Sequence, residues 1–545
     1  MSRDTIPTFV TELPLRVTDK QASTMLVRFD YARQLYNACL GEGLRRLALI
    51  RQSKAYQSAC YIPKTEAHNK ERAEAFGAIR KEYKFTDYDL QDYAGTIKLG
   101  WIGSSVVQKV ATRAFNAVNR YSYGKAGRPR FKSHDQFDSL EGKQNSVISW
   151  NGLTVTWGGL VMIVAPFSVD SKANDVLMHG LDAPVKYVRI VRRKLNGKNH
   201  FFVQLVNAGI PFHKAKNTIG QGLVGIDIGP STIAIAAPTV QHAELKMFCN
   251  ELKKDEQKIR RLQRKQDRQR RANNPQNYNP DKTIKTGAKE WHKSLAYQDT
   301  QRKLSETHRK LAEYRESLHG HLVNQIVAMG NDIKMEKLSY RAFQKIYGRS
   351  VGMRAPGKFV NLLKRKAVSA GVSVTEFSTR TTKLSQVCLC GSVKKKPLSQ
   401  RWHTCECGVK AQRDLFSALL AACVEGERLN ADLTNYHWQS GMETCLRAAL
   451  SEVKPAIDGH LPVTFGLGWS QSGSPVRVWN EPGEIRNVVA SAGENLCQGR
   501  ESEKACSCSR TPSLLGWGVV SETFLDIWSI NCIISPLVND PNPGG

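Results

Sequence analysis

The 545-residue chain is strongly basic and contains enough apolar residues to form packed cores. Lys and Arg number 79 against 49 Asp and Glu, which gives a formal charge of +30, and 41% of the residues are hydrophobic. This composition excludes a disordered chain, and the length exceeds what one core usually organises. The charge excess indicates a polyanionic partner, above all nucleic acid.

A membrane-bound protein is the main alternative for such a charge, but the sequence does not favour it. The most apolar stretch near the C-terminus is interrupted by Glu522 and Asp526, so we expect no membrane span. Residues 1–8 carry no apolar signal core. The 13 cysteines are an odd, scattered set and do not resemble a secreted disulfide framework. We therefore expect reduced thiols and a cytoplasmic location.

The first 210 residues alternate between strand-like and helical patterns. Residues 9–17 have strand-like content, and residues 23–51 begin a helical region. A glycine- and arginine-rich loop over 124–133 ends that region. Residues 146–205 are β-like, and Asn196 followed by glycine between two apolar runs is typical of a hairpin. These patterns predict a small barrel or open sheet beside a helical region.

The second half begins with two short buried strands, the first at Leu223 and the second over 232–237. Residues 253–271 hold ten basic and three acidic residues in helix-favouring sequence. The next helical stretch repeats leucine every seven residues, which predicts a long helix packed against another element. After about residue 455 the sequence is rich in Gly, Ser and Pro and predicts no regular structure.

Three acidic residues stand in unusual surroundings. Asp227 lies within V-G-I-D-I-G, Glu336 within I-K-M-E-K-L, and Asp414 at the start of an apolar helix. Singly, Asp414 could be a helix N-terminal charge and Glu336 a solvated strand end. Together they offer hard oxygen ligands that could hold two Mg²⁺ ions about 4 Å apart across a scissile phosphate. Arg413 could neutralise that phosphate or be an ordinary surface arginine.

A cluster of cysteines predicts a zinc site. Two close pairs, separated by 14 residues, could supply four ligands to a tetrahedral Zn²⁺, and each pair is followed by a glycine suited to a tight turn. Both pairs are C-x-C, whereas the common knuckle is C-x-x-C, so His403 is a candidate substitute ligand. The alternative is a reduced, metal-free loop. The predicted ligands are Cys388, Cys390, Cys405 and Cys407.

Six motifs resemble those of TnpB, a nuclease family of bacterial insertion sequences long described as transposases and related to compact type V CRISPR effectors. The resemblance spans roughly residues 10–425, and the order of the motifs also matches. The motifs are G-R-P-R-F-K-S (127–133), G-I-D-I-G (225–229), L-Q-R-K-Q-D-R-Q-R-R-A-N-N-P (262–275), M-E-K-L-S (335–339), T-K-L-S-Q-V-C-L-C-G (382–391) and C-E-C-G-V-K-A-Q-R-D (405–414).

The resemblance implies a multidomain α+β protein. An N-terminal wedge-like, oligonucleotide-binding β-barrel is interrupted by a helical recognition region, and a RuvC nuclease domain of RNase H-like α/β fold carries a zinc-ribbon insertion. The implied boundaries are 1–22 and 124–215 for the barrel, 23–123 for the recognition region, 216–380 and 412–450 for the RuvC domain, 381–411 for the zinc insertion and 451–545 for a poorly specified tail.

The function implied by the resemblance is RNA-guided DNA cleavage by an enzyme of a transposable element. Asp227, Glu336 and Asp414 take the acidic RuvC positions that bind two Mg²⁺ ions, and the four cysteines bind a structural Zn²⁺. Where the family usually has Asn, this chain has Phe416, which we expect to pack within the helix. The implied partners are a guide RNA from the transposon end, bound by one protein monomer, and double-stranded DNA with a short adjacent motif.

Basic residues in two of these motifs are expected to bind nucleic acid. Phosphate contacts supply affinity without reading sequence, and in a guided nuclease the RNA reads sequence by pairing. A solvated basic helix face is the alternative. The predicted residues are Arg128, Arg130 and Lys132 in the loop, and Arg264, Lys265, Arg268, Arg270 and Arg271 in the helix.

Three other functions are compatible with the same charge and motifs. A guided DNA-binding regulator would not cut, but all three carboxylates are present. A compact type V CRISPR effector would be distinguished by a repeat array beside its gene instead of a transposon end. A self-sufficient transposase would join DNA ends without any RNA.

Overall fold

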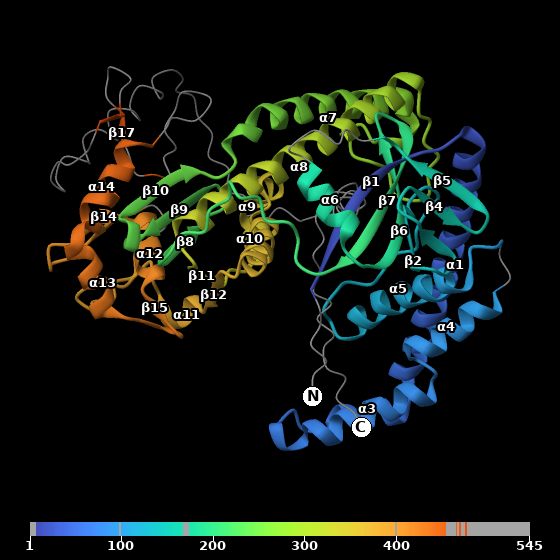
Figure 1. The fold of residues 1–545 in the computed structure, drawn as a ribbon, viewed down its shortest axis with the longest axis horizontal. Coiled ribbons are helices and arrows are strands. Elements are labelled where there is room, and N and C mark those ends of the chain that lie inside the picture. Colours follow the sequence, from blue (N-terminus) through green and yellow to red (C-terminus); the bar gives the residue numbers. More distant parts are fainter. Residues whose placement is uncertain are drawn as a thin grey trace. The chain divides into compact units, whose positions relative to one another are not determined.

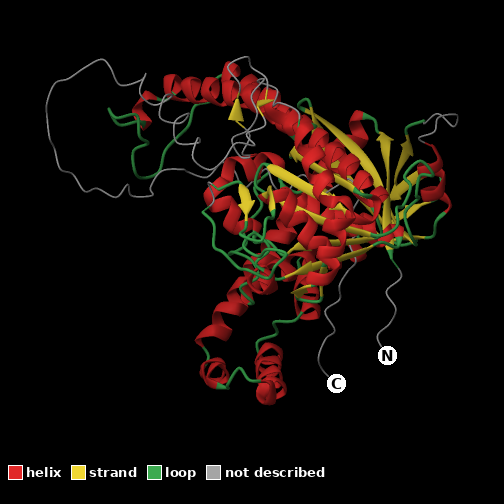
Figure 2. Ribbon diagram, turned by 90° about the vertical axis from the view of Figure 1, so that its left-hand side faces the viewer, coloured by secondary structure: helices red, strands yellow, loops and turns green. Residues whose placement is uncertain are grey.

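The computed structural model describes residues 7–97, 100–166, 174–397 and 400–453, together with residues 465, 468–469 and 475–476. These residues form a multidomain α/β structure of two compact units, one ending at Lys214 and the other beginning at Ala215. Helices and strands occur in both units (Figures 1 and 2). Most of the predicted tail, 451–545, lies outside the described residues. Within the described ranges, no helix is long and apolar enough to cross a membrane.

The first unit contains a seven-stranded antiparallel sheet in the order β2-β6-β7-β1-β5-β4-β3. The sheet nearly closes into a barrel, because a Cβ built at Gly142 of β2 would lie 3.2 Å from Ile148 of β3, at the other end of the order. The predicted hairpin is present, and its turn at Asn196 and Gly197 has φ of +48° and +86°. The strands are β1 (Thr8–Arg16), β2 (Ser139–Lys143), β3 (Ile148–Trp150), β4 (Thr154–Trp157), β5 (Leu160–Val164), β6 (Val185–Leu195) and β7 (Lys198–Ala208).

Helices of the first unit share one hydrophobic core with this sheet. Phe29 of α1 packs edge-on against Trp157 of β4, with ring centroids 6.2 Å apart, and α1 also packs along α5. A capping box between Thr18 and Gln21 starts α1. The helices are α1 (Asp19–Gln52), α2 (Lys54–Tyr61), η1 (Glu66–His68), α3 (Asn69–Glu82), α4 (Asp87–Thr96), α5 (Ser104–Ser122) and α6 (Asn174–Asp182).

The second unit is built on a five-stranded mixed sheet in the order β10-β9-β8-β11-β12. The first three strands are antiparallel neighbours, and β11 pairs in parallel with both β8 and β12. Side chains alternate between the two faces of the sheet along β8, so Val224 and Ile226 lie in one hydrophobic core and Gly225 lies on the opposite face. The strands are β8 (Leu223–Ile228), β9 (Thr232–Ala237), β10 (His242–Met247), β11 (Asp332–Glu336) and β12 (Ser373–Phe377).

Helices cover both faces of this sheet. The core with Val224 also contains residues of α8 and α10, whereas a separate core on the other face contains α12 and α14. The predicted long helix is α8, which packs along α7 (Figure 1). The helices are η2 (Pro238–Val240), η3 (Asn250–Leu252), α7 (Lys253–Asn273), η4 (Pro275–Asn277), α8 (Leu295–Met329), α9 (Tyr340–Arg354), α10 (Pro356–Ala370), α11 (Thr379–Thr382), α12 (Arg413–Ala422), α13 (Ala431–His437), η5 (Trp438–Met442) and α14 (Glu443–Ser451).

Short two-stranded ribbons complete the described part of the chain. One ribbon immediately precedes α12 and another follows it, so both ends of this helix are held by local pairing. The ribbons are β13 (Trp402–Thr404) with β14 (Lys410–Gln412), β15 (Val424–Glu425) with β16 (Arg428–Leu429), and β17 (Gly468–Trp469) with β18 (Pro475–Val476).

Candidate functional site

Two of the three predicted carboxylates lie at the ends of neighbouring strands. In the parallel pairing of β8 with β11, Ile226 is opposite Met335, and each is followed directly by an acidic residue. Asp227 and Glu336 therefore occupy adjacent positions where the two strands end. Because side chains alternate along a strand, both acids lie on the face opposite the core that holds Ile226 and Met335.

The third carboxylate reaches the same place on α12. A Cβ built at Gly225 would lie 1.9 Å from the Ala418 carbonyl oxygen, so α12 touches the backbone of β8 at this point. Asp414 lies one helical turn before Ala418, and Asp227 lies two residues beyond Gly225 on the same face of β8. The helix therefore carries Asp414 toward Asp227. Gln412 caps the helix by accepting a hydrogen bond from the Leu415 N–H at 2.8 Å.

The three acids interact electrostatically. Burial raises the pKa of Asp227 well above its usual range, the negative charges of Asp414 and Glu336 raise it further, and Arg413 opposes them. Burial also raises the pKa of Glu336. Arg413 donates from Nε to Asp414 Oδ1 at 3.3 Å and from Nη1 to the Gln400 carbonyl at 3.1 Å. Poorly hydrated carboxylates that repel one another are suited to binding hard divalent cations, so this donor set fits Mg²⁺.

Two residues support this arrangement through contacts that the sequence did not reveal. Gly225 permits the close approach of α12. Its position two residues before Asp227 was the sign in the sequence that another element could approach the strand there. Lys334 lies two residues before Glu336 on the same face of β11, and it is 8% exposed. Its Nζ lies 3.5 Å from Asp332 Oδ2, and its positive charge interacts electrostatically with Cys423, the residue that follows α12. A cation near the C-terminal end of α12 stabilises that helix through its dipole.

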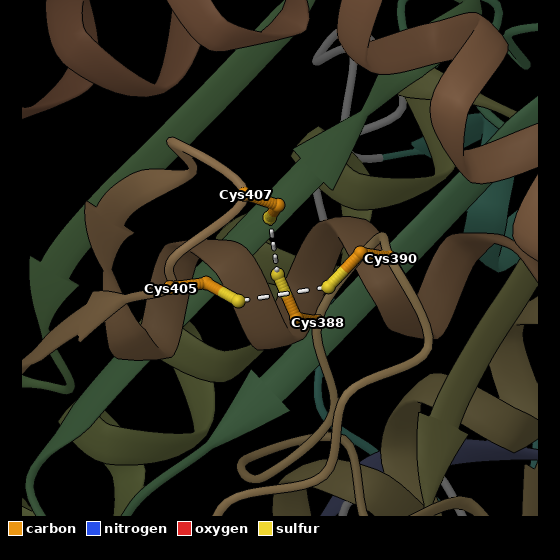
Figure 3. Close-up of side chains that lie close together, drawn as sticks. All are labelled: Cys388, Cys390, Cys405 and Cys407. Carbon is orange, nitrogen blue, oxygen red and sulfur yellow. Dashed lines mark hydrogen bonds between the residues drawn. The ribbon is translucent and has the colours of Figure 1, made fainter.

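The four predicted cysteines come together in a second cluster (Figure 3). Their Sγ atoms all lie within 4.8 Å of one another. The Sγ of Cys388 is 3.5 Å from that of Cys407, and the Sγ of Cys390 is 3.5 Å from that of Cys405. Four sulfurs about 2.3 Å from a tetrahedral Zn²⁺ would be about 3.8 Å apart. The cluster therefore fits a zinc ion despite its C-x-C spacing.

The two cysteine turns have the same backbone geometry. In the first, the Gly391 N–H donates to the Cys388 carbonyl at 3.0 Å, and the Cys388 N–H donates to the Ser392 carbonyl at 2.9 Å. The second turn, from Cys405 to Val409, repeats both bonds at 3.1 and 3.0 Å. The glycine of each turn has positive φ, +80° in the first and +90° in the second. Glycine is needed here because a side chain disfavours this conformation.

His403, the candidate substitute ligand, packs against Phe416 and Lys396. In the part of the chain that the structure describes, the metal-ligand cluster comprises the four cysteines without it. His403 is buried against Phe416, with ring centroids 4.5 Å apart, and its Nδ1 contacts the Lys396 ammonium. Burial, followed by the charge of Lys396, lowers the pKa of His403 to about 4. Phe416 is buried, and its ring contacts residues outside its own helix, His403 and Trp438.

The structure divides the predicted basic residues of α7 into two groups. Arg264, Lys265 and Arg268 are exposed, and their spacing places them on one side of the helix. Arg270 and Arg271 are instead half-buried and form ion pairs with Asp267. The Arg270 guanidinium also lies 5.6 Å from the ring centroid of Trp291. The exposed group is therefore better placed to meet a phosphate backbone.

The predicted basic loop of the first unit is fixed to α1. Asn37 accepts from the Lys132 N–H and donates to the Lys132 carbonyl, both at 2.8 Å. Arg33 donates to the same carbonyl at 3.3 Å. Arg128 and Arg130 are exposed, whereas Lys132 is half-buried. Side chains of α1 thus fix the loop backbone at Lys132, two residues after the exposed Arg130.

Comparison with known proteins gives one family match and several structural matches. Residues 357–420 match the family model described as Cas12f1-like, TNB domain, and no curated protein matches the chain. A cryo-EM structure of the Cas12f1-sgRNA-target DNA complex is 12% identical, with a TM-score of 0.43, over 74% of this chain and 82% of that chain. A cryo-EM structure of a CRISPR-Cas12f ternary complex is 12% identical, with a TM-score of 0.24, over 75% and 85%. The matched segment contains α10, the cysteine cluster and most of α12, and it supports the resemblance to the TnpB-like family.

Proposed function

We propose that this chain is an RNA-guided DNA endonuclease of the TnpB kind, encoded by a transposable element. The convergence of Asp227, Glu336 and Asp414 from three separate elements carries this proposal. In the proposed RuvC-type centre, two Mg²⁺ ions would activate a water molecule and stabilise the leaving oxygen of a phosphodiester. The partners are a guide RNA, bound by a single protein monomer, and double-stranded target DNA.

The protein side chains have distinct tasks in such a reaction. Asp227 and Glu336 supply oxygen ligands from rigid strand ends, which fixes their separation. Asp414 supplies a ligand from the first turn of α12, where the helix dipole favours its charge. Arg413 offers a positive charge beside the phosphate. Burial, followed by the charges of Asp414 and Glu336, raises the pKa of Asp227, and bound cations would stabilise its ionised form.

The proposed zinc site lies directly before Asp414 in the sequence. The second cysteine turn leads through β14 directly into α12, so a Zn²⁺ ion on the four thiolates would fix the start of the helix that carries Asp414. The family match over 357–420 covers this whole connection. We assign the ion a structural role because four protein ligands leave no open position.

Binding of nucleic acid is supported by the exposed charge. The net charge of +30 and the exposed basic side of α7 suit an A-form heteroduplex, which a protein grips through its phosphates. In the first unit, the exposed Arg128 and Arg130 precede Lys132, whose backbone is held by Asn37, and they could make further phosphate contacts. Sequence would then be read by the guide and by a short motif adjacent to the target.

A compact type V CRISPR effector is the second candidate, and the match to a Cas12f1-like domain favours it. Both candidates are guided nucleases and share the same centre. A repeat array beside the gene would identify the effector, and a transposon end would identify the TnpB kind.

The test is Mg²⁺-dependent cleavage of a plasmid library by the protein purified with its co-expressed RNA. Asp227→Ala should abolish cleavage, and Asp299→Ala, at a partly exposed aspartate on α8, is the matched control that should cleave normally. Replacing Mg²⁺ with EDTA should also abolish cleavage. RNA-dependent DNA binding without cleavage would refute the endonuclease and support a regulator, and end joining without RNA would support a transposase.

A further inference from the structure

The loop between the two cysteine turns is fixed at both ends. Near its start, the Lys394 N–H donates to the Gln386 carbonyl at 3.0 Å, next to the first turn. Near its end, Arg413 of α12 donates from Nη1 to the Gln400 carbonyl at 3.1 Å. The loop therefore contacts both the segment that leads into the first cysteine pair and the helix that carries Asp414.

One lysine of this loop is partly withdrawn from solvent. Lys394 and Lys395 are exposed, whereas the third lysine of the run, Lys396, is half-buried. Its ammonium contacts Nδ1 of His403, which is 2% exposed. An ammonium group can only donate, so Nδ1 of His403 is the acceptor. Because the ring centroids of His403 and Phe416 are 4.5 Å apart, these contacts join the loop to α12.

The cysteine cluster interacts electrostatically with Lys396. Burial lowers the pKa of Lys396, negative charge on Cys388 and Cys405 opposes this shift, and Arg413 and Lys394 add to it. Four thiolates outweigh the charge of one Zn²⁺ ion, so a zinc-loaded cluster would be anionic. A nearby cation favours the thiolate, which is the form that binds the metal. The Lys396 ammonium and a zinc-loaded cluster would therefore stabilise each other.

We propose that Lys396 is the positively charged partner of the zinc-bound thiolates, and that its contact with His403 holds the start of α12 in place. Residues that surround the ligands of a metal tune its affinity, and an ammonium group suits an anionic set of four thiolates. His403 lies two residues before Cys405 and packs on Phe416, so the same contact reaches both the second cysteine turn and the helix. This role rests on the proposed zinc site and makes Lys396 a positioning residue, which binds no zinc itself.

The zinc affinity of charge variants tests the first part of this proposal. The full chain, purified with its RNA, is loaded with zinc and titrated with a chromophoric chelator. Lys396→Gln keeps an N–H donor for His403 but removes the charge, and it should weaken zinc binding about 10-fold to 100-fold. Lys396→Arg should restore most of the affinity, because it restores the charge. Lys395→Gln, at the exposed neighbour, is the matched control and should bind zinc as the wild-type protein does.

Hydrogen exchange tests the contact with His403. Lys396→Met removes the donor as well as the charge, so at saturating zinc the amide groups of residues 413–417 should exchange faster than in Lys396→Gln. Equal exchange in these two variants would overturn the contact. Unchanged zinc affinity in Lys396→Gln, or no rescue by Lys396→Arg, would overturn the charge role.

The same measurements separate this role from the assignments on which it rests. A zinc-free wild-type protein would overturn the zinc site and the role of Lys396 together. The expected zinc affinities in a protein that cuts no target DNA would refute the endonuclease and leave the role of Lys396 standing.

Discussion

Replacing Gly225 with alanine should misplace Asp414 without touching any carboxylate. The new Cβ would lie 1.9 Å from the Ala418 carbonyl oxygen and 2.4 Å from the Ala422 nitrogen, and both are backbone atoms that cannot rotate away. Real Cβ contacts are seldom closer than 3.0–3.4 Å, so α12 must recede by the difference, 1.1–1.5 Å. Nearly every residue of α12 is buried, which makes the helix resist this shift.

The expected effects follow from this displacement. Overpacking typically costs about 1–3 kcal/mol of folding stability, and each kcal/mol lowers the Tm of a domain this large by roughly 2–4 °C. A misplacement of about 1 Å at a reacting centre can reduce the rate about 100-fold. We therefore expect Gly225→Ala to remain folded at 25 °C and to cleave target DNA about 100-fold more slowly, with weaker Mn²⁺ binding.

The assay combines thermal unfolding by circular dichroism, isothermal titration with Mn²⁺, and single-turnover cleavage. Gly320→Ala in α8 is the matched control, because a Cβ there meets only the Lys366 Nζ at 3.7 Å, and it should leave all three readouts nearly unchanged. A folded Gly225→Ala protein with normal metal binding and normal cleavage would refute the inference that α12 positions Asp414 through its contact with β8.

Three further predictions concern the acid cluster, the cysteines and the basic helix. Burial raises the pKa of Asp227 above 3.8, so the metal-free protein should lose stability as the pH rises from about 4 to that raised pKa. Asp227→Asn should remove this loss of stability and raise the Tm at pH 7, as measured by circular dichroism. The same variant should abolish cleavage. Cys405→Ser should eliminate one bound zinc per chain in elemental analysis and lower the Tm, whereas Cys60→Ser, at an exposed cysteine outside the cluster, should retain the zinc; a zinc-free wild-type protein would refute the site. Arg264→Gln with Arg268→Gln should reduce the salt slope of duplex binding by about 0.9 for each phosphate that the two arginines neutralise, and an unchanged slope in a filter-binding titration would exclude α7 from the interface.

The sequence could indicate the chemistry of both clusters because their signals are local. Flanking apolar residues mark Asp227 as a strand residue, and its neighbouring glycines indicate little bulk around it. The C-x-C pairs with their glycines mark two tight turns. The match of residues 357–420 to a Cas12f1-like domain agrees with the resemblance based on these motifs. The domain boundaries and the roles of the site residues stay predictions.

Only the tertiary structure decided which side chains meet. Strand register pairs Ile226 with Met335 and so places Asp227 beside Glu336, and that register depends on long-range packing rather than on either strand alone. The same packing turned His403 toward Phe416 instead of the thiols. Along α7, ion pairing with Asp267 draws two of the five predicted basic residues away from the exposed side. Residue type and spacing fix what a side chain can bind, but the free energy of packing distant elements together determines what lies next to it.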